Sequence, residues 1–178
     1  MRKITNIELN RPSVAEFSEI EKIPVVVVLD NIRSLQNVGS LFRTCDAFVA
    51  EELALCGITA TPPNRDIHKT ALGAELTVKW SYYPTTIECA SELKQRGYKL
   101  IAIEQVEESI MLNDFTIKEG EKYAIILGNE VMGVDQEVVD ICDSAIEIPQ
   151  AGTKHSINVS IAGGVVLWSL FCQFQQNR

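Results

Sequence analysis

The stretch Pro24-Val25-Val26-Val27-Val28-Leu29 is an unbroken apolar run, and the polar loop Asp30-Asn31-Ile32-Arg33-Ser34 follows it. A run of β-branched residues without polar alternation is typical of a parallel strand that is buried on both faces. From Val38 to Phe48, apolar residues then recur at three- and four-residue intervals, which predicts an amphipathic helix. The segment therefore predicts a strand-loop-helix unit of the kind that builds parallel sheets.

The same alternation continues along the chain. We expect further strands at 52–56, 77–82, 100–104, 123–127 and 145–148, and helices at 67–72, 85–96, 135–141 and 156–174. Residues 105–121 are interpreted as an edge or covering loop, and the acidic stretch 104–108 as a solvated face. The pattern predicts an α/β fold with a mostly parallel sheet flanked by helices. In such sheets ligands bind beyond the carboxyl ends of the strands, which directs attention to the loops after Leu29, Leu127 and Ile148.

Composition limits the class of protein. The 178 residues are 46% hydrophobic, and 16 Lys and Arg against 24 Asp and Glu give a net charge of −8. Such a surface repels phosphate, so any nucleic-acid site must be local. The five cysteines are odd in number and widely spaced, which favours buried thiols in a reducing compartment over disulfides or zinc. With no signal region and no apolar stretch long enough for a membrane span, we expect a soluble cytoplasmic protein.

The first candidate loop leads into a helix that carries Asn37, Ser40 and Arg43 at three-residue spacing. This spacing places an amide, a hydroxyl and a guanidinium on roughly one helical face, near the strand ends. Such a helix start is a reasonable platform for phosphate or ribose. A capped helix with a solvated arginine explains the same residues.

The second candidate loop is Leu127-Gly128-Asn129-Glu130-Val131-Met132-Gly133. It follows a buried strand and matches neither the dinucleotide fingerprint nor the phosphate-binding loop of nucleotide triphosphatases. Gly133 predicts a turn into a helix capped by Asp135. A tight turn without function is the alternative interpretation.

The third candidate loop begins at Ile148-Pro149-Gln150 and ends in Ser156-Ile157-Asn158-Val159-Ser160. It leads into an almost wholly apolar helix, for which Ser156 is the expected N-cap. Asn158 and Ser160 in such a helix are expected to face a ligand or to satisfy buried backbone groups. A helix that is apolar nearly all round must be buried on several sides, in part by a second subunit.

Taken together, the three loops resemble the three motifs of the SpoU/TrmH-like family of RNA 2'-O-ribose methyltransferases, in the SPOUT class. Asn37-x-Gly39-x-x-x-Arg43 is similar to the first motif, Leu127-Gly128-Asn129-Glu130-x-x-Gly133 to the second, and Ile148-Pro149 with Ser156-Ile157-Asn158-Val159-Ser160 to the third. Gln150 and Ile157 depart from the Met and Leu that are common in the family. The resemblance implies a C-terminal trefoil knot, with residues 1–178 as a single SpoU-type domain made of an N-terminal extension (1–23) and a knotted core (24–174).

The resemblance also implies the chemistry. The cofactor would be S-adenosylmethionine, with S-adenosylhomocysteine as product and no metal, and the partners would be RNA and a second copy of the chain, without DNA or membrane. Cofactor binding is expected from Leu127, Gly128, Asn129, Glu130, Gly133, Ile148, Gln150, Ser156 and Ile157. Catalytic roles are expected for Arg43, Asn37, Ser156, Asn158 and Glu130. A guanidinium is too weak a base to remove a proton, so Arg43 is expected to orient the ribose and phosphate and to stabilise the developing alkoxide. Asn37 is expected to help hold Arg43 and the site.

Basic residues near the loops are expected to form a rim that binds RNA: Arg33, Arg43, Arg65, His68, Lys69 and Lys154. A solvated surface is the alternative interpretation for the group Arg65 to Lys69. The two histidines show no metal-ligand spacing.

Transfer RNA is preferred over ribosomal RNA as the substrate, since a small chain without appendages must recognise local RNA shape. Two other functions fit the motifs: a knotted module that binds RNA or cofactor without catalysis, and a SPOUT enzyme that methylates a base. The presence of all five catalytic candidates favours an enzyme, and the arginine of the first motif favours ribose over base. A nucleotide oxidoreductase is disfavoured, because the chain lacks a dinucleotide fingerprint.

Overall fold

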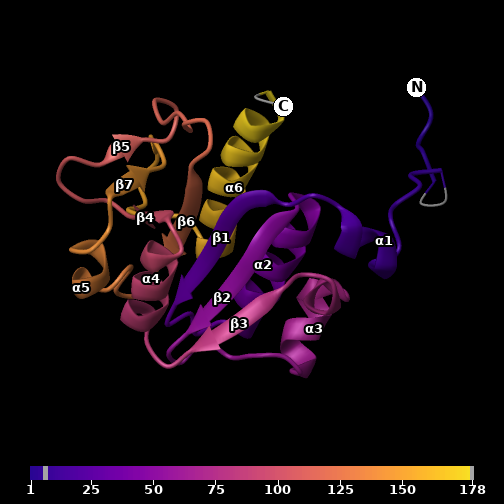
Figure 1. Ribbon diagram of the computed structural model, residues 1–178, viewed down its shortest axis with the longest axis horizontal. Coiled ribbons are helices and arrows are strands. Elements are labelled where there is room, and N and C mark those ends of the chain that lie inside the picture. Colours follow the sequence, from indigo (N-terminus) through magenta and orange to yellow (C-terminus); the bar gives the residue numbers. More distant parts are fainter. Residues whose placement is uncertain (6–7, 177–178) are drawn as a thin grey trace.

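Seven parallel strands form one sheet in the computed structural model, which describes residues 1–5 and 8–176 (Figure 1). Residues 6–7 of the expected extension and 177–178 therefore lie outside the described residues. The strand order is β3-β2-β1-β6-β4-β7-β5. The strands are β1 (Ile23–Asp30), β2 (Ala50–Cys56), β3 (Trp80–Tyr83), β4 (Tyr98–Ile103), β5 (Ile110–Met111), β6 (Lys122–Leu127) and β7 (Ser144–Glu147).

Helices cover both faces of this sheet. They are α1 (Val14–Glu19), α2 (Leu35–Ala47), α3 (Arg65–Ala71), the 3-10 helix η1 (Ala74–Leu76), α4 (Thr86–Gln95), α5 (Gln136–Val139) and α6 (Val159–Gln176). One apolar core lies between the sheet and α2, α3 and α6, and a second lies between the sheet and α4 and α5. The predicted class, a parallel sheet flanked by helices, is confirmed.

The central strand β1 joins the two cores. Val25, Val27 and Leu29 belong to the core on the α2 side, while Val26 and Val28 belong to the core on the α4 side. All five are at most 1% exposed, so the unbroken apolar run is explained by burial on both faces. Helix α2 starts directly after the loop, with the Ser34 side chain accepting a hydrogen bond from the Asn37 backbone N–H.

The alternation at 77–82 was misleading about the start of β3, which begins only at Trp80. Thr77 instead closes η1, and its hydroxyl donates to Asp46 Oδ1 at 2.7 Å and to the carbonyl of Ala74 at 3.1 Å. Its hydroxyl thus has local partners that a strand would not supply. Residues 105–121 contain the short strand β5, which pairs with β7 at the sheet edge. This agrees with the interpretation of the segment as an edge of the sheet.

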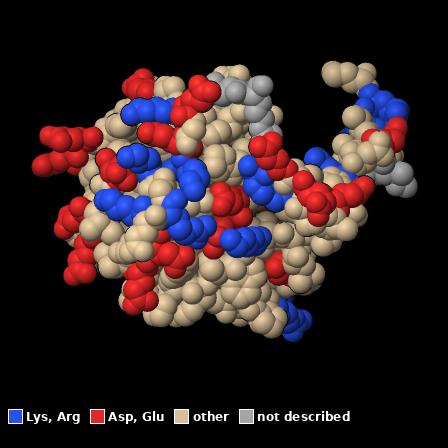
Figure 2. All heavy atoms as spheres, viewed as in Figure 1, with Lys and Arg blue, Asp and Glu red and all other residues tan. Residues whose placement is uncertain are grey.

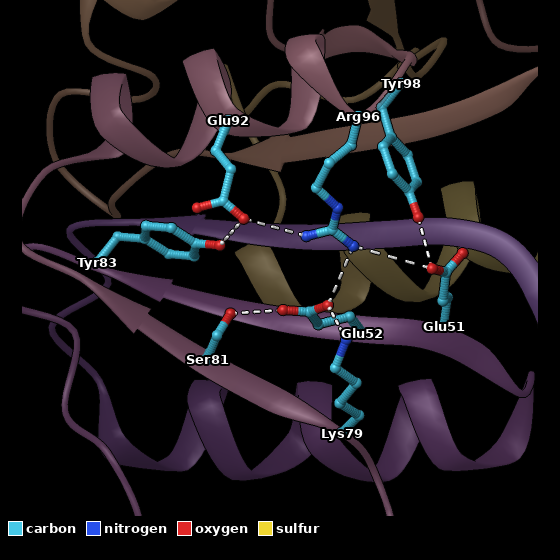
Figure 3. Close-up of polar contacts among 8 residues, drawn as sticks. All are labelled: Glu51, Glu52, Lys79, Ser81, Tyr83, Glu92, Arg96 and Tyr98. Atoms are coloured by element: carbon cyan, nitrogen blue, oxygen red, sulfur yellow. Dashed lines mark hydrogen bonds and ion pairs between the residues drawn. The ribbon is translucent and has the colours of Figure 1, made fainter.

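A network of charged side chains lies between α4 and the β2–β3 part of the sheet (Figure 3). At its centre Glu52, 2% exposed, accepts hydrogen bonds from Lys79 Nζ at 2.8 Å and Ser81 Oγ at 2.6 Å. Arg96 Nη2 approaches the same carboxylate at 3.5 Å. Burial by itself would raise the pKa of Glu52, but these partners hold the pKa below its usual value. Figure 2 shows Lys and Arg side chains intermixed with Asp and Glu side chains on this face.

Within the described residues, no helix is long and apolar enough to cross a membrane.

Candidate functional site

A cavity of about 520 Å³ opens at the carboxyl ends of β4, β6 and β7. The sequence pointed to this edge of the sheet, and every residue expected to bind the cofactor lines the cavity. These are Leu127, Gly128, Asn129, Glu130, Gly133, Ile148, Gln150, Ser156 and Ile157. These residues therefore line one cavity, and the individual role of each in binding stays a prediction.

The turn after β6 has its shape fixed by Asn129. The Asn129 and Gly133 backbones exchange two hydrogen bonds, and Asn129 Oδ1 accepts from the N–H groups of Val131 and Met132 at 3.0 and 2.9 Å. Glycine is required at both ends of this turn. A Cβ on Gly128 would lie 1.9 Å from the carbonyl carbon of Gly133, and Gly133 itself has φ of +73°. The predicted tight turn is therefore present, and it forms one wall of the cavity.

Asp135, the expected cap of the following helix, makes no capping hydrogen bond with its side chain. Its backbone N–H donates to Asp30 Oδ2 at 2.9 Å, and its carboxylate accepts from Asn31 Nδ2 at 3.4 Å. The negative charge of Asp30 raises the pKa of Asp135. Asp135 thus occupies the predicted N-cap position of α5, but it caps the helix without a side-chain hydrogen bond.

Glu130 joins the second loop to the start of α2. Its carboxylate accepts hydrogen bonds from the backbone N–H groups of Arg33 and Ser34, both at 3.2 Å, and from Asn37 Nδ2 at 2.8 Å. Burial tends to raise the pKa of Glu130, but these donors hold the pKa below its usual value. A carboxylate held in this way is ionised at neutral pH and fixes the helix start.

Asn37 continues the connection to the third loop. Its Oδ1 accepts from Asn158 Nδ2 at 3.1 Å, so Glu130, Asn37 and Asn158 form one hydrogen-bond chain across all three loops. Asn37 is 8% exposed, and both ends of its amide are used by this chain. Asn37 thus helps to hold the site, as expected, but its amide contacts Glu130 and Asn158 and makes no contact with Arg43 among the described residues.

Asn158, and not Ser156, caps the last helix. Asn158 Oδ1 accepts from the Ser160 backbone N–H at 2.8 Å and from the Ser160 hydroxyl at 2.6 Å, and α6 begins at Val159. The predicted helix start was three residues early, because Ser156 and Asn158 are both good N-cap residues and only the fold selects between them. Ser156 is left exposed in the loop and lines the cavity.

Arg43 lies on α2 outside the cavity lining. It follows Asn37 by six residues, about 9 Å along the helix axis. Its side chain is exposed and makes no hydrogen bond or ion pair to the part of the chain that the structure describes. The guanidinium is thus free to meet a ligand from solvent.

The expected basic rim is only partly near the cavity. Arg33 and Lys154 are exposed and adjoin the site, Arg33 through its backbone bond to Glu130 and Lys154 as the neighbour of the lining residue His155. Arg65, His68 and Lys69 lie on α3, which packs on α2, and none of them lines the cavity. Lys69 pairs with Asp66 at 2.6 Å, and His68 contacts Glu75. Local partners thus take up part of the charge on α3.

Two residues that the sequence analysis placed outside the site, Glu104 and Gln105, also line the cavity. Glu104 Oε2 accepts from the Val134 N–H at 3.1 Å, and Gln105 Nε2 donates to the carbonyl of His155 at 3.1 Å. The interpretation of 104–108 as a solvated face is therefore wrong at Glu104, which is partly buried, while Gln105 is exposed as expected. No local signal separates these two residues from the acidic run that follows, because their contacts come from loops far along the chain.

Comparison with known proteins supplies the family. Residues 24–168 match the SpoU rRNA Methylase family. The chain is 30% identical over 162 residues to the tRNA (guanosine(18)-2'-O)-methyltransferase of Thermus thermophilus. This match covers 90% of this chain and 81% of the relative.

Two solved structures share the fold. The TrmH/SpoU tRNA modifying enzyme of Aquifex aeolicus superposes with a TM-score of 0.80 at 26% identity, over 92% of this chain and 83% of the other. An AdoMet-bound rRNA methyltransferase of Sinorhizobium meliloti gives a TM-score of 0.76 at 25% identity, over 86% of this chain and 58% of the other. The expected SPOUT knot fold is therefore confirmed.

Proposed function

This chain belongs to the SpoU family of S-adenosylmethionine-dependent RNA 2'-O-ribose methyltransferases, and from this premise we propose that it methylates a ribose 2'-hydroxyl of transfer RNA. The observation that carries the proposal is the chain of hydrogen bonds from Glu130 through Asn37 to Asn158 at the edge of the cavity. These hydrogen bonds hold α2, which carries Arg43, in a fixed position relative to the two loops that line the cavity. Transfer of a group between two bound substrates requires such a fixed relation between their binding regions.

The cavity fits an adenosylated amino acid. Its volume of about 520 Å³ lies in the range of small-molecule sites, about 300 to 1,000 Å³. Apolar side chains of Ile103, Leu127 and Ile148 offer contact area for a base, and the turn after β6 offers backbone polar groups. The turn can close only because Gly128 has no side chain, since a Cβ there would lie 1.9 Å from the carbonyl carbon of Gly133.

The residues of this chain have distinct tasks in the proposed reaction. The bound cofactor supplies an electrophilic methyl group for in-line displacement by the ribose oxygen. Arg43 orients the ribose and phosphate and stabilises the negative charge that develops on that oxygen. Glu130 and Asn37 are positioning residues, since they hold the start of α2 and hence the placement of Arg43. Ser156 and Asn158 complete the wall of the cavity on the α6 side.

Support for transfer RNA comes from the tRNA (guanosine(18)-2'-O)-methyltransferase of Thermus thermophilus, which is 30% identical to this chain over 162 residues. This chain is therefore proposed to act on transfer RNA. Its five cysteines are all free, which supports the proposal that it works in a reducing compartment such as the cytoplasm.

We further propose that the protein works as a homodimer through α6. Ile161, Val165 and Trp168 are 58%, 39% and 53% exposed, and their spacing of four and three residues places them on one helical face. Trp168→Glu is expected to convert a dimer into a monomer in analytical ultracentrifugation. Leu76→Glu, at an apolar residue of η1 that is 75% exposed, should leave the dimer intact. A wild-type monomer at micromolar concentration would refute the proposal.

The function is tested with radiolabelled S-adenosylmethionine and separate pools of unmodified transfer and ribosomal RNA. We expect label in alkali-resistant 2'-O-methyl dinucleotides from transfer RNA, reduced at least about 100-fold in Arg43→Ala. Lys118→Ala, which removes an exposed cation near the amino end of β6, serves as the matched control. Label in ribosomal RNA alone would contradict the substrate, label in a base would contradict ribose transfer, and no label with intact cofactor binding would favour a binding module.

A further inference from the structure

The cavity has a charge of one sign. Its lining includes the carboxylates of Glu104, Glu130 and Glu147 and, among the described residues, neither a lysine nor an arginine. His155 is the remaining titratable side chain in the lining. Clefts lined by one sign of charge focus the electric field on what they bind. An anionic cavity in a protein proposed to act on RNA is unexpected, unless the small ligand is a cation.

Of the three carboxylates, Glu104 is the one that receives no side-chain hydrogen bond from the residues that the structure describes. Glu147 accepts a hydrogen bond from Ser109 Oγ at 3.1 Å, and Glu130 is held by Asn37 and the start of α2. Glu104 accepts from the backbone N–H groups of Gln105 at 2.8 Å and Val134 at 3.1 Å.

The position of Glu104 is fixed by the fold. Ile103 pairs with Leu127 across β4 and β6, so that Glu104 follows β4 directly beside the turn at Gly128–Gly133. A Cβ on Gly133 would lie 2.1 Å from Glu104 Oε2, so the carboxylate lies against the backbone of this turn. Since the turn forms a wall of the cavity, the charge of Glu104 is held at the cavity itself.

Resting on the proposed function, we infer that Glu104 makes the cavity selective for the cationic methyl donor over the neutral product. In the transfer, the sulfonium–methyl bond breaks, the ribose oxygen gains the methyl group, and the hydroxyl proton leaves to solvent. The donor carries an ammonium, a carboxylate and a sulfonium, and therefore a net charge of +1. The product carries the ammonium and the carboxylate, and therefore no net charge. The attraction to Glu104 is lost when the methyl group leaves, which promotes exchange of product for donor.

The test compares two unreactive ligands by isothermal titration calorimetry. S-adenosylhomocysteine is the neutral thioether, and sinefungin has a protonated amine in place of the sulfonium, so its charge matches that of the donor. The wild-type protein is expected to bind sinefungin more tightly than S-adenosylhomocysteine. Glu104→Gln is expected to lower this affinity ratio about fivefold, since a unit charge several ångströms away acts through partly screened solvent. Glu107→Gln, the same change at an exposed residue outside the lining, should preserve the ratio.

The outcomes separate the inference from the proposed function. If Glu104→Gln weakens both ligands equally, the residue only supports the turn and the inference is overturned. An unchanged ratio overturns it as well. If the wild-type protein binds neither ligand, the cofactor assignment fails, and the proposed function fails with it. Thermal unfolding of both variants verifies that the ratio is measured on folded protein.

Discussion

The carboxylate of Glu52, on strand β2, and that of Glu130, in the turn after β6, are satisfied by opposite means. Glu52 lies between α4 and the sheet and meets Lys79, Arg96 and a serine hydroxyl (Figure 3). Glu130 lies at the cavity and meets an amide and two backbone N–H groups, with no cation. A carboxylate paired with cations contributes to the fold and attracts little else, whereas a carboxylate held by neutral donors keeps its charge available. The kind of hydrogen-bond donor thus distinguishes the structural cluster around Glu52 from the functional cluster around Glu130.

The largest effect is expected on the structural side of this comparison. Glu52→Ala leaves Lys79 and Arg96 without their shared partner and opens a void, which should lower the free energy of unfolding by about 2 to 3 kcal/mol. Urea unfolding measures this loss. Binding of S-adenosylhomocysteine to the folded fraction should be unchanged. Glu51 Oε1 lies 3.9 Å from Arg96 Nη2. Glu51→Gln should therefore lower the free energy of unfolding by less than about 1 kcal/mol. Equal losses in the two variants would remove the distinction between buried and surface charge.

On the functional side, Asn37→Asp places a second carboxylate within hydrogen-bond distance of Glu130. We expect a loss of about 1 to 2 kcal/mol at pH 7, because the donated hydrogen bond becomes a repulsion between like charges. Asn158 Nδ2 can still donate to the new side chain, so the third loop keeps its contact. The loss should shrink on acidification, as measured by urea unfolding at pH 7 and pH 4.5. A loss that does not depend on pH would point to packing instead of charge.

Glu130→Gln should have a smaller effect on stability. The folded-state pKa of Glu130 is below its unfolded value of about 4.3, so its contribution is complete above that pH and is lost as the pH falls through the lowered pKa. We expect Glu130→Gln to lower the free energy of unfolding by about 0.5 kcal/mol at pH 7, a small value because the residue is exposed. This difference from the wild-type protein should vanish in acid. Thermal unfolding as a function of pH tests this. A difference that grows in acid would contradict the assigned direction of the pKa shift.

The smallest effect is expected at Asp135, where two carboxylates already face each other. Its pKa is raised by Asp30, so the charged form is disfavoured in the folded state and Asp135→Asn should stabilise the protein at pH 7. The gain should be a few tenths of a kcal/mol, because the residue is exposed. It should decrease as the pH falls through the raised folded-state pKa and disappear below the unfolded-state pKa of about 3.9. Chemical denaturation at pH 7 and pH 3 measures both. Destabilisation at pH 7 would show that the contact of Asn31 with the Asp135 carboxylate outweighs the repulsion.

Periodicity predicted six of the seven strands of the sheet, but it did not predict the two-residue strand β5 or the short helix α1. The run Val25 to Leu29 is informative because burial on both faces demands apolar residues at every position. The start of β3 was missed because Thr77 satisfies its hydroxyl in a turn, which alternation does not reveal. The cap of α6 was missed because Ser156 and Asn158 compete on equal terms in the sequence.

The candidate site was predictable where its residues form contiguous motifs. Gly128 to Gly133 fold into a turn that depends on near neighbours, so the sequence describes it well. Glu104 belongs to the site only because β4 pairs with β6, and strand order is a property of the whole sheet. Asn37 was assigned to the wrong partner for the same reason, since Glu130 and Asn158 are 93 and 121 residues away.

The hydrogen bond between Asn37 and Asn158 also bears on the biogenesis of the protein. It joins the second helix to the last one, so this contact cannot form while α6 is still within the ribosome. Contacts between residues so distant in sequence form late in folding, because closing the intervening chain costs entropy. A nascent or truncated chain can therefore build most of its sheet without a complete site. Acquisition of a working site thus waits for the emergence of α6.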